Sequence, residues 1–533
     1  MTHSHARALR SASSTVALRR GLSALNVLFL TLAFALTAAA QKQADAARQK
    51  LPAPDKIIGD YAKAVGGKRR LAAISDATYE WTASTADQRD GRATTRTQSP
   101  ASVYGSVQLA GGETSWGTTP RAAWVRGRDS VVRTLTDERA KLARLRATLE
   151  ASKLFDYKKL NLSALTVGVE TVGTEQAYAV EFRSRDGARV RYLFGATTKL
   201  LLAVQDSDSH MLARYDDYPL GQKDMRYPHR VELNLEDLGT VTLTLQSVHY
   251  NTSFAASVFD APKAEGLDAR ALIKEVLEKE PATNVKYEEF TYTVKHIERE
   301  LNEKGETTKE TSRVLDIFMT PKGQSVGKLV EENGAPLSAA AAAKQEKQVA
   351  DYLAAHENDK PDPNQRKGAG GFRIALGDYG FGLDDLLRAS EFVSPRREIF
   401  KGREAIVFDY RARADFVPKS KNDEILKKIV GLIWIDAADK VVARIEARLT
   451  DDFKLGGGLL MNIKGAGFVF ERAHMPDGYW VPRFYHWNAN GKGFIFKKMS
   501  VYEMTEWSNF KRFKTESGDA KIDAPKSQPT PQP

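Results

Sequence analysis

Apolar and polar positions alternate with two different periods along this chain. Apolar residues recur at helical spacing over residues 54–65, and Gly66-Gly67 supplies the positive φ that ends such a helix. From residue 78 the period changes to two, so residues 78–83 predict a strand. Asp90-Gly91 is expected to form the hairpin turn that follows. The pattern thus predicts a helix followed by antiparallel strands.

A second helix and a long run of strands come next. Thr136 is expected to begin the helix, whose apolar stripe consists of Leu142, Leu145 and Leu149. Strands joined by tight turns are then predicted almost without interruption up to Pro262. Such alternation is typical of an antiparallel sheet with one apolar face.

The second half of the chain repeats this order of elements. Asp268 begins a helix with the apolar spacing of the first one, and Ser338 can cap a long alanine-rich helix that ends near His356. The segment Gly173–Phe182 resembles Gly402–Tyr410, and matching strands follow each of them in the same order. The sequence therefore predicts duplication of a whole domain rather than a short-period repeat.

The first 40 residues have the features of a secretory signal peptide. Residues 1–21 carry four arginines and no acid, an apolar stretch begins at Leu22, and Ala38-Ala39-Ala40 offers a small-residue cleavage site. An uncleaved anchor is the alternative. Residues 41–53 are predicted to be a linker and residues 515–533 a disordered tail. We expect export across the inner membrane and a periplasmic location.

Composition excludes several classes of protein. The 533 residues include no cysteine, which excludes disulfide scaffolds, thiolate zinc sites and thiol nucleophiles. The chain has 79 Lys and Arg residues and 68 Asp and Glu residues, which gives a net charge of +11. Without the four arginines of the predicted signal peptide there are 75 basic and 68 acidic residues, and the net charge is +7. No basic cluster alternates with aromatic residues, so a nucleic-acid partner is not predicted. A mildly basic surface is compatible with an anionic membrane surface.

The inventory of catalytic motifs is thin. The chain has no phosphate-binding Gly-x4-Gly-Lys-Ser/Thr loop and no His-Glu-x-x-His helix. His474 and His486 are twelve residues apart, and we interpret them as surface or strand-edge residues. Asp216-Asp217 and Asp451-Asp452 are adjacent carboxylates, which point to opposite faces on a strand. We therefore predict no enzyme, catalytic residue, metal or cofactor, although a hydrolase with acids on separate strands stays open.

The predicted strands of this chain are rich in apolar and aromatic residues. Each half offers only one or two substantial helices to cover a long sheet. A curved sheet with one apolar face and few covering helices leaves a groove, and such a groove suits acyl chains.

The opening helix resembles a known family. The segment D-K-I-I-G-D-Y-A-K-A-V-G-G, residues 55–67, is similar to the first helix of exported outer-membrane lipoprotein-sorting proteins, which resemble the periplasmic lipoprotein carrier LolA. Gly173–Phe182, Asp216-Asp217-Tyr218 and Tyr227-Pro228 continue the resemblance. The second half, with segments such as Trp480-Val481-Pro482-Arg483, looks like a divergent copy.

This resemblance implies an unclosed antiparallel half-barrel, capped by helices, whose apolar concave face binds lipid or lipoprotein acyl chains. The fold class that we predict is mainly antiparallel β (α+β), as two tandem LolA-like half-barrels over residues 51–262 and 263–514. The function that we predict is an exported carrier of lipid or acylated lipoprotein that acts without covalent chemistry. Because relatives include two-domain periplasmic stress sensors, an envelope sensor or scaffold that binds a partner protein is the alternative.

The predicted ligand groove follows from strand alternation, because every second side chain shares one face. An error of one residue in register would move a whole set to the other face. The alternative for each residue is that it packs beneath the helices. The groove residues predicted in the first half are Tyr79, Trp81, Val190, Tyr192, Phe194, Val241, Leu243 and Leu245, and those in the second are Leu432, Trp434, Phe494 and Phe496.

Overall fold

The computed structural model describes residues 51–512 apart from residues 88, 284–289, 303–306, 321–323, 359–372, 377–378, 451–452, 456–460 and 494–496. The predicted signal segment 1–40, most of the linker 41–53 and the tail 515–533 lie outside the described residues. Contacts divide the chain into a unit up to Ile57 and a unit from Ile58 onward, and the description below concerns the second unit.

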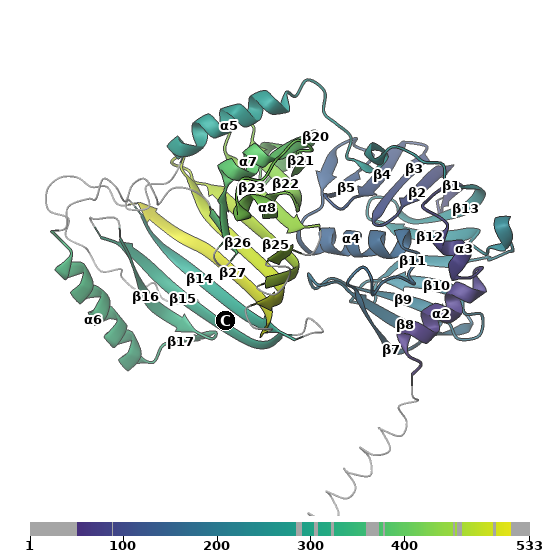
Figure 1. Cartoon of the computed structure of the whole chain (residues 1–533), viewed down its shortest axis with the longest axis horizontal. Helices are drawn as coiled ribbons and strands as arrows, with labels where there is room; N and C mark the ends of the chain where they lie inside the picture. Colours follow the sequence, from purple (N-terminus) through teal and green to yellow (C-terminus); the bar gives the residue numbers. More distant parts are fainter. Residues whose placement is uncertain are drawn as a thin grey trace, which may run out of the picture. The chain divides into compact units, whose positions relative to one another are not determined.

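The first sheet is entirely antiparallel and has 13 strands in the order β6-β5-β4-β3-β2-β1-β13-β12-β11-β10-β9-β8-β7 (Figure 1). Its strands are β1 Asp76–Thr85, β2 Asp90–Gln98, β3 Ser102–Leu109, β4 Gly112–Thr118, β5 Ala123–Arg126, β6 Val132–Thr134, β7 Ser163–Val172, β8 Glu175–Arg183, β9 Arg189–Gly195, β10 Leu201–Gln205, β11 Met211–Asp216, β12 Arg230–Leu235 and β13 Gly239–Tyr250.

The path of the chain through this sheet leaves the sheet open. From β1 the chain runs outward to the edge strand β6 and crosses through α4 (Asp137–Ala151) to β7 at the other edge. It then runs back inward until β13 pairs with β1. Since β6 and β7 end the strand order, the sheet does not close into a barrel.

The second sheet follows the same plan. Its main order is β17-β16-β15-β14-β27-β26-β25-β23-β22-β21-β20, with β24 beside β25, and its first strand again pairs with its last. The strands are β14 Phe290–Leu301, β15 Thr307–Met319, β16 Ser325–Glu332, β17 Ala335–Pro336, β20 Ser390–Phe400, β21 Arg403–Ala412, β22 Ile429–Asp436, β23 Val442–Leu449, β24 Phe453–Leu455, β25 Met461–His474, β26 Trp480–Gly493 and β27 Lys497–Arg512, while β18 (Arg373–Leu376) and β19 (Tyr379–Gly382) form a separate hairpin. The chain is thus two tandem unclosed antiparallel half-barrels, as the sequence predicts. The exact domain bounds, 51–262 and 263–514, stay a prediction.

Helices are few. Besides α4 they are α2 Pro54–Ala64, α3 Lys68–Ala72, α5 Ala269–Thr283, α6 Ala339–Ala355, α7 Leu383–Ala389 and α8 Lys421–Leu426, with short 3-10 turns η1 Gln222–Asp224 and η2 Ala256–Phe259. Within the described residues, none of these helices combines the length and apolar character that a membrane-crossing helix needs.

Local signals set the helix ends as the sequence predicts. Thr136 is the N-cap of α4, and Gly66 and Gly67 end α2 with φ of 125° and 93°. The Ser338 side chain accepts a hydrogen bond from the Ala341 amide at the start of α6, and His356 is the C-cap. These ends depend on neighbours in sequence, which is why a sequence pattern finds them.

The predicted turn at Asp90-Gly91 is wrong. The first hairpin turns between Thr85 and Asp90, and Gly91 already lies in β2 opposite Ala83. A Cβ on Gly91 would lie 1.9 Å from the Gln108 carbonyl oxygen of the neighbouring strand. The glycine therefore serves the close approach of β2 and β3, not a turn.

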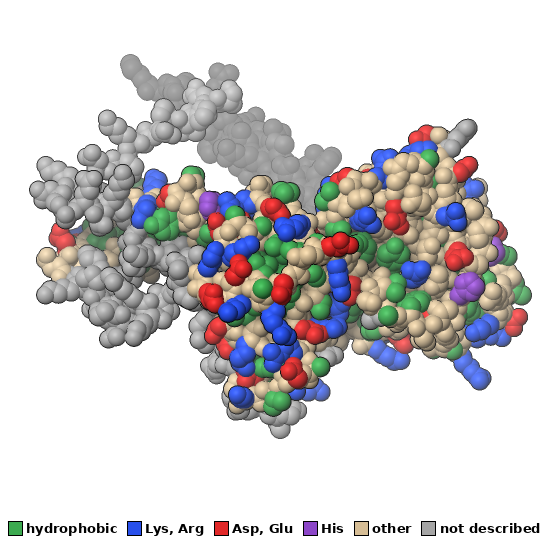
Figure 2. Space-filling view, turned by 90° about the horizontal axis from the view of Figure 1, so that it is seen from above, with side chains coloured by type: hydrophobic (Ala, Val, Ile, Leu, Met, Phe, Trp, Pro, Cys, Tyr) green, Lys and Arg blue, Asp and Glu red, His purple; other side chains and the backbone are tan. Residues whose placement is uncertain are grey.

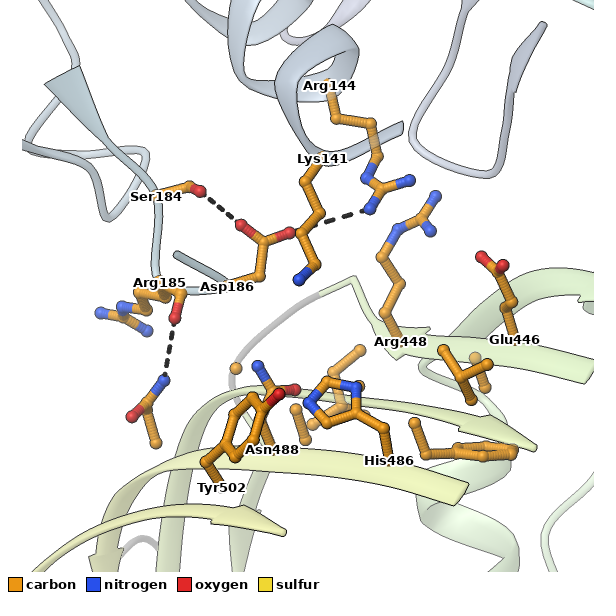
Figure 3. Close-up of a pocket in the computed structure, with 18 of the residues that line it drawn as sticks. Lys141, Arg144, Ser184, Arg185, Asp186, Glu446, Arg448, His486, Asn488 and Tyr502 are labelled. Atoms are coloured by element: carbon orange, nitrogen blue, oxygen red, sulfur yellow. Dashed lines mark hydrogen bonds and ion pairs between the residues drawn. The ribbon is translucent and has the colours of Figure 1, made fainter. Parts of the chain in front are cut away.

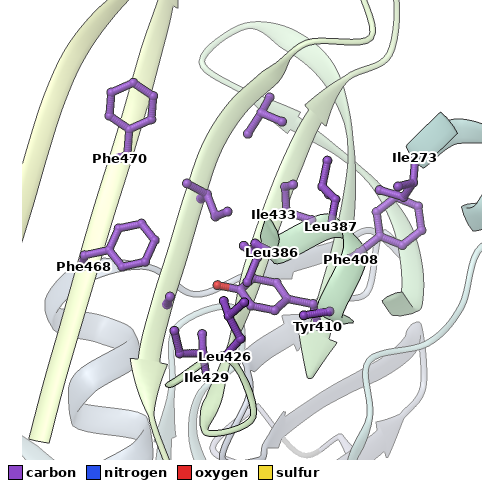
Figure 4. Close-up of a cluster of buried hydrophobic side chains, with 14 of the residues drawn as sticks. Ile273, Leu386, Leu387, Phe408, Tyr410, Leu426, Ile429, Ile433, Phe468 and Phe470 are labelled. Atoms are coloured by element: carbon purple, nitrogen blue, oxygen red, sulfur yellow. The ribbon is translucent and has the colours of Figure 1, made fainter. Parts of the chain in front are cut away.

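The core of the second half packs on one face of its sheet. Figure 4 shows Phe408, Tyr410 and Ile433 from β21 and β22 gathered with Leu386 and Leu387 of α7. All five side chains are buried. On the molecular surface, Figure 2 shows Lys and Arg side chains interspersed with Asp and Glu side chains on the face in view.

Candidate ligand cavity

The first half-barrel contains a largely apolar cavity of about 250 Å³. Its floor comes from the inner face of the sheet, and α4 and α3 form part of its walls. Helix α4 packs against β2, β3, β5 and β9, so this one helix covers only part of the face. That this cavity is the groove expected from a long sheet with few helices stays a prediction.

Aromatic side chains line the cavity on the β1 side. The rings of Tyr79 and Trp81 stack with their centroids 5.9 Å apart, and Tyr250 meets Tyr79 edge to face at 6.4 Å. The Trp81 indole Nε1 donates to the Thr95 hydroxyl at 3.0 Å, which satisfies its only donor. Burial raises the pKa of Tyr79 to about 12, so this wall carries no charge near neutral pH.

Three charged side chains from α4 and its C-terminal end interrupt the apolar lining. Arg146 and Glu150 form an i,i+4 ion pair at 3.4 Å. The Lys153 ammonium donates to the Thr97 hydroxyl at 3.3 Å and to the Glu150 carbonyl at 3.4 Å. Burial lowers the Lys153 pKa from 10.5 to about 8, against the opposing attraction of Glu150 and Asp76. Burial also disfavours the Arg146 charge, but Glu150, Tyr215 and Tyr192 together outweigh it and the Arg146 pKa is raised.

Two buried polar atoms of the cavity lining have no hydrogen-bond partner among the described residues. They are the Tyr192 hydroxyl and the Arg146 Nε. Tyr192 is only 2% exposed and its pKa is raised well above the usual value, mainly by burial. A buried polar atom without a hydrogen-bond partner destabilises the folded protein, and the described residues supply no partner for either atom.

Four of the groove residues predicted for the first half line this cavity: Tyr79, Trp81, Tyr192 and Leu243.

The other four predicted residues of the first half pack into the core. Val190, Phe194 and Val241 are fully or almost fully buried, and Leu245 packs against the cluster that includes Val241. The rings of Phe194 and Tyr61 are 5.3 Å apart. For these four, a role in ligand contact rests on the strand pattern alone.

The predicted residues of the second half lie elsewhere. Leu432 and Trp434 are buried in a cluster with Ala122, Ala405 and Val407. Phe494 and Phe496 fall outside the described residues. The assignment of this second set to a ligand groove therefore stays a prediction from the sequence.

Sequence reasoning missed the charged residues of the cavity. The leucine stripe of α4 identified its buried face, but Arg146 directly follows Leu145, and Lys153 comes after the helix has ended. Lys153 has a φ of 56°, a left-handed conformation that no sequence pattern predicts for a lysine. An interrupted apolar stripe was the one available signal.

A second, more polar pocket of about 510 Å³ is lined by residues from both halves (Figure 3). Figure 3 shows Arg144 and Asp186 opposite Arg448 and His486. The Arg144 guanidinium lies 3.7 Å from the Asp186 carboxylate. Burial and the nearby Arg144 lower the Arg448 pKa to about 9, and burial lowers that of His486 to about 4. Its acids and bases are nearly balanced, so it does not select a ligand charge.

One group of side chains has the composition of a cation site. Asp206, Asp208 and His210 bring their oxygen and nitrogen atoms within 4.8 Å of one another. The Asp206 carboxylate accepts from the backbone amides of Asp208 and His210, and it lies 3.0 Å from the His210 ring. These bonds build the turn between β10 and β11 and account for the arrangement.

Comparison with known proteins gives matches among solved structures. No protein-family model matches the chain, and no curated protein matches it. A LolA superfamily protein from Nitrosomonas europaea matches with 12% identity and a TM-score of 0.26, over 40% of this chain and 99% of that one. A putative outer membrane lipoprotein-sorting protein domain from Vibrio parahaemolyticus matches with 11% identity and a TM-score of 0.26, over 38% and 95%.

A third match is the MucA/MucB complex of Pseudomonas aeruginosa, with 8% identity and a TM-score of 0.18, over 85% of this chain and 93% of that one. The first two matches carry names of the family that the opening helix resembles. At such identities and TM-scores, the likeness does not extend to a ligand, an activity or a partner.

Proposed function

We propose that this protein is an exported carrier of the cell envelope that holds an acyl chain of a lipid or lipoprotein without covalent chemistry. The cavity of the first half-barrel carries the proposal, since aromatic and aliphatic side chains form most of its walls. Export and a periplasmic location rest on the predicted signal peptide, with its basic start and Ala38-Ala39-Ala40 site.

Binding would be an equilibrium driven by burial of methylene groups. Each buried methylene contributes about 0.8 kcal/mol, so a chain of ten carbons contributes about 8 kcal/mol, from which a cost of association of at least about 4 kcal/mol is subtracted. Release then requires only competition from a membrane or another carrier.

The test is extraction of the protein from its native envelope with organic solvent, followed by mass spectrometry of the extract. We expect a stoichiometric acyl lipid, and uptake of a fluorescent fatty-acyl probe by the emptied protein. Absence of both a bound lipid and probe uptake would refute the proposal.

An envelope sensor or scaffold is the second candidate, and one observation favours it. The edge strand β7 exposes Leu165, Val167 and Val169 on one face, with exposed fractions of 51%, 39% and 39%. An exposed apolar edge strand can pair with a strand of another protein. If this candidate is correct, pull-down from an envelope extract returns a stoichiometric protein, Val167→Lys abolishes the capture, and no lipid accompanies the protein.

A further inference from the structure

We infer that the cavity of the first half-barrel selects an amphiphile with an anionic head, held by Lys153 and Arg146, with its apolar chain against the aromatic wall. This inference rests on the proposed function and names the chemical class of its ligand.

The charges of the cavity favour an anion. Arg146, Lys153 and Arg226 are the cations among its lining residues, and Glu150 is the only carboxylate among them. Glu150 already pairs with Arg146. Arg226 is exposed and donates to the Tyr218 carbonyl at 2.8 Å. One positive charge inside the cavity, that of Lys153, is therefore left over.

Lys153 is placed to meet a ligand. Among the described residues, its ammonium donates hydrogen bonds only to a hydroxyl and a carbonyl oxygen, and no carboxylate lies within 4 Å of it. A partly buried ammonium is strongly stabilised by a carboxylate or phosphate oxygen, because charge-assisted hydrogen bonds are the strong ones in a medium that excludes water.

Two buried donors of the cavity lining also lack hydrogen-bond partners among the described residues. Tyr192, a hydroxyl donor, and the Arg146 Nε both lack partners, and Arg146 and Glu150 are among the groups that act electrostatically on Tyr192. An oxygen of the ligand head that reached these two buried atoms would satisfy donors that a hydrocarbon chain leaves unpaired. A neutral head can accept hydrogen bonds but lacks the charge attraction to Lys153 that an anionic head gains.

The experiment compares amphiphiles of one chain length that differ only in the head: decanoate, decyl phosphate and 1-decanol. Their dissociation constants are measured at pH 7 by displacement of a fluorescent acyl probe from the full chain. The variant is Lys153→Met, which keeps the length of the side chain and removes its charge. The matched control is Lys159→Met, a lysine whose side chain is 78% exposed and which does not line the cavity.

We expect the unaltered protein and the Lys159→Met control to bind at least one acid about tenfold more tightly than 1-decanol. Lys153→Met should lose this preference but keep its affinity for 1-decanol, which also shows that the variant is folded. The two acids distinguish a carboxylate head from a phosphate head.

Two results would overturn the inference alone: 1-decanol bound as tightly as both acids by the unaltered protein, or an acid preference that survives in Lys153→Met. If none of the three amphiphiles displaces the probe or binds, the proposed acyl cavity fails as well.

Discussion

Lys153→Met should make the empty protein more stable at neutral pH, although it removes a native hydrogen-bond donor. Lys153 contributes an ammonium group to a largely apolar cavity without a carboxylate partner among the described residues. A cation held there without its ligand is a cost to the folded state, and methionine fills the same space without charge.

The size of the effect follows from the pKa. The Lys153 pKa falls from 10.5 to about 8 on folding, chiefly because of burial. Each unit of pKa corresponds to about 1.4 kcal/mol, so at pH 7 the charged side chain destabilises the folded protein by up to about 3 kcal/mol. Between pH 8 and pH 10.5 the Lys153 side chain is protonated in the unfolded chain but largely neutral in the folded protein. The destabilisation by the charge therefore declines as the pH rises from about 8 to 10.5. At pH 10 less than about 1 kcal/mol of it is left.

The assay is urea unfolding followed by tryptophan fluorescence, at pH 7 and at pH 10. Lys153→Met should raise the unfolding midpoint clearly at pH 7 and only slightly at pH 10. The control Lys159→Met should change the free energy of unfolding by no more than about 0.5 kcal/mol at either pH. If Lys153→Met destabilises the protein at pH 7, or if its effect is equal at both pH values, the ammonium is not desolvated and the reasoning is refuted.

Two further changes test the cavity and the core. Val103→Trp should fill part of the cavity and weaken probe binding at least tenfold, while Val417→Trp, at a residue 71% exposed, should leave binding unchanged in the same titration. Asp409→Ala removes the carboxylate that accepts from the buried Arg396 Nη1 at 2.8 Å. It should lower the free energy of unfolding by about 3 kcal/mol because the buried guanidinium loses one of its two carboxylate partners, the other being Glu398 at 3.0 Å. An equal effect of Asp415→Ala, whose carboxylate is 80% exposed, would contradict that explanation.

The elements set by sequence neighbours were predictable. Ser338 and Gly66-Gly67 act within a few residues of themselves, and Thr136 occupies the N-cap position of α4 without a side-chain capping bond. All three stand at the helix ends that the sequence indicates. Strand alternation likewise gave the fold class, because each half repeats a single antiparallel plan. The turn predicted at Asp90-Gly91 was wrong because glycine is required there by the close approach of the Gln108 backbone on the neighbouring strand, not by a turn.

The site itself was predictable only in part. Alternation put Tyr79, Trp81 and Val190 in apolar positions, and the structure confirms that each is shielded from water to some degree. Which of them lines a cavity depends on where α4 covers the sheet, and that is a long-range property. The position of the Lys153 charge, which we propose selects the ligand, depends in addition on a left-handed backbone after the end of α4.

The cavity wall that contains Trp116 shows why a sequence pattern does not predict such a site. Trp116 on β4 lies directly opposite Gly105 on β3, and both side-chain positions point to the same face. A Cβ on Gly105 would lie 2.2 Å from the Trp116 ring, so the ring occupies the space that any other residue at 105 would need. The absence of a side chain on one strand thus fixes the place of a large one on the next. The cavity wall is therefore a property of the pair, and neither residue signals it in its own stretch of sequence.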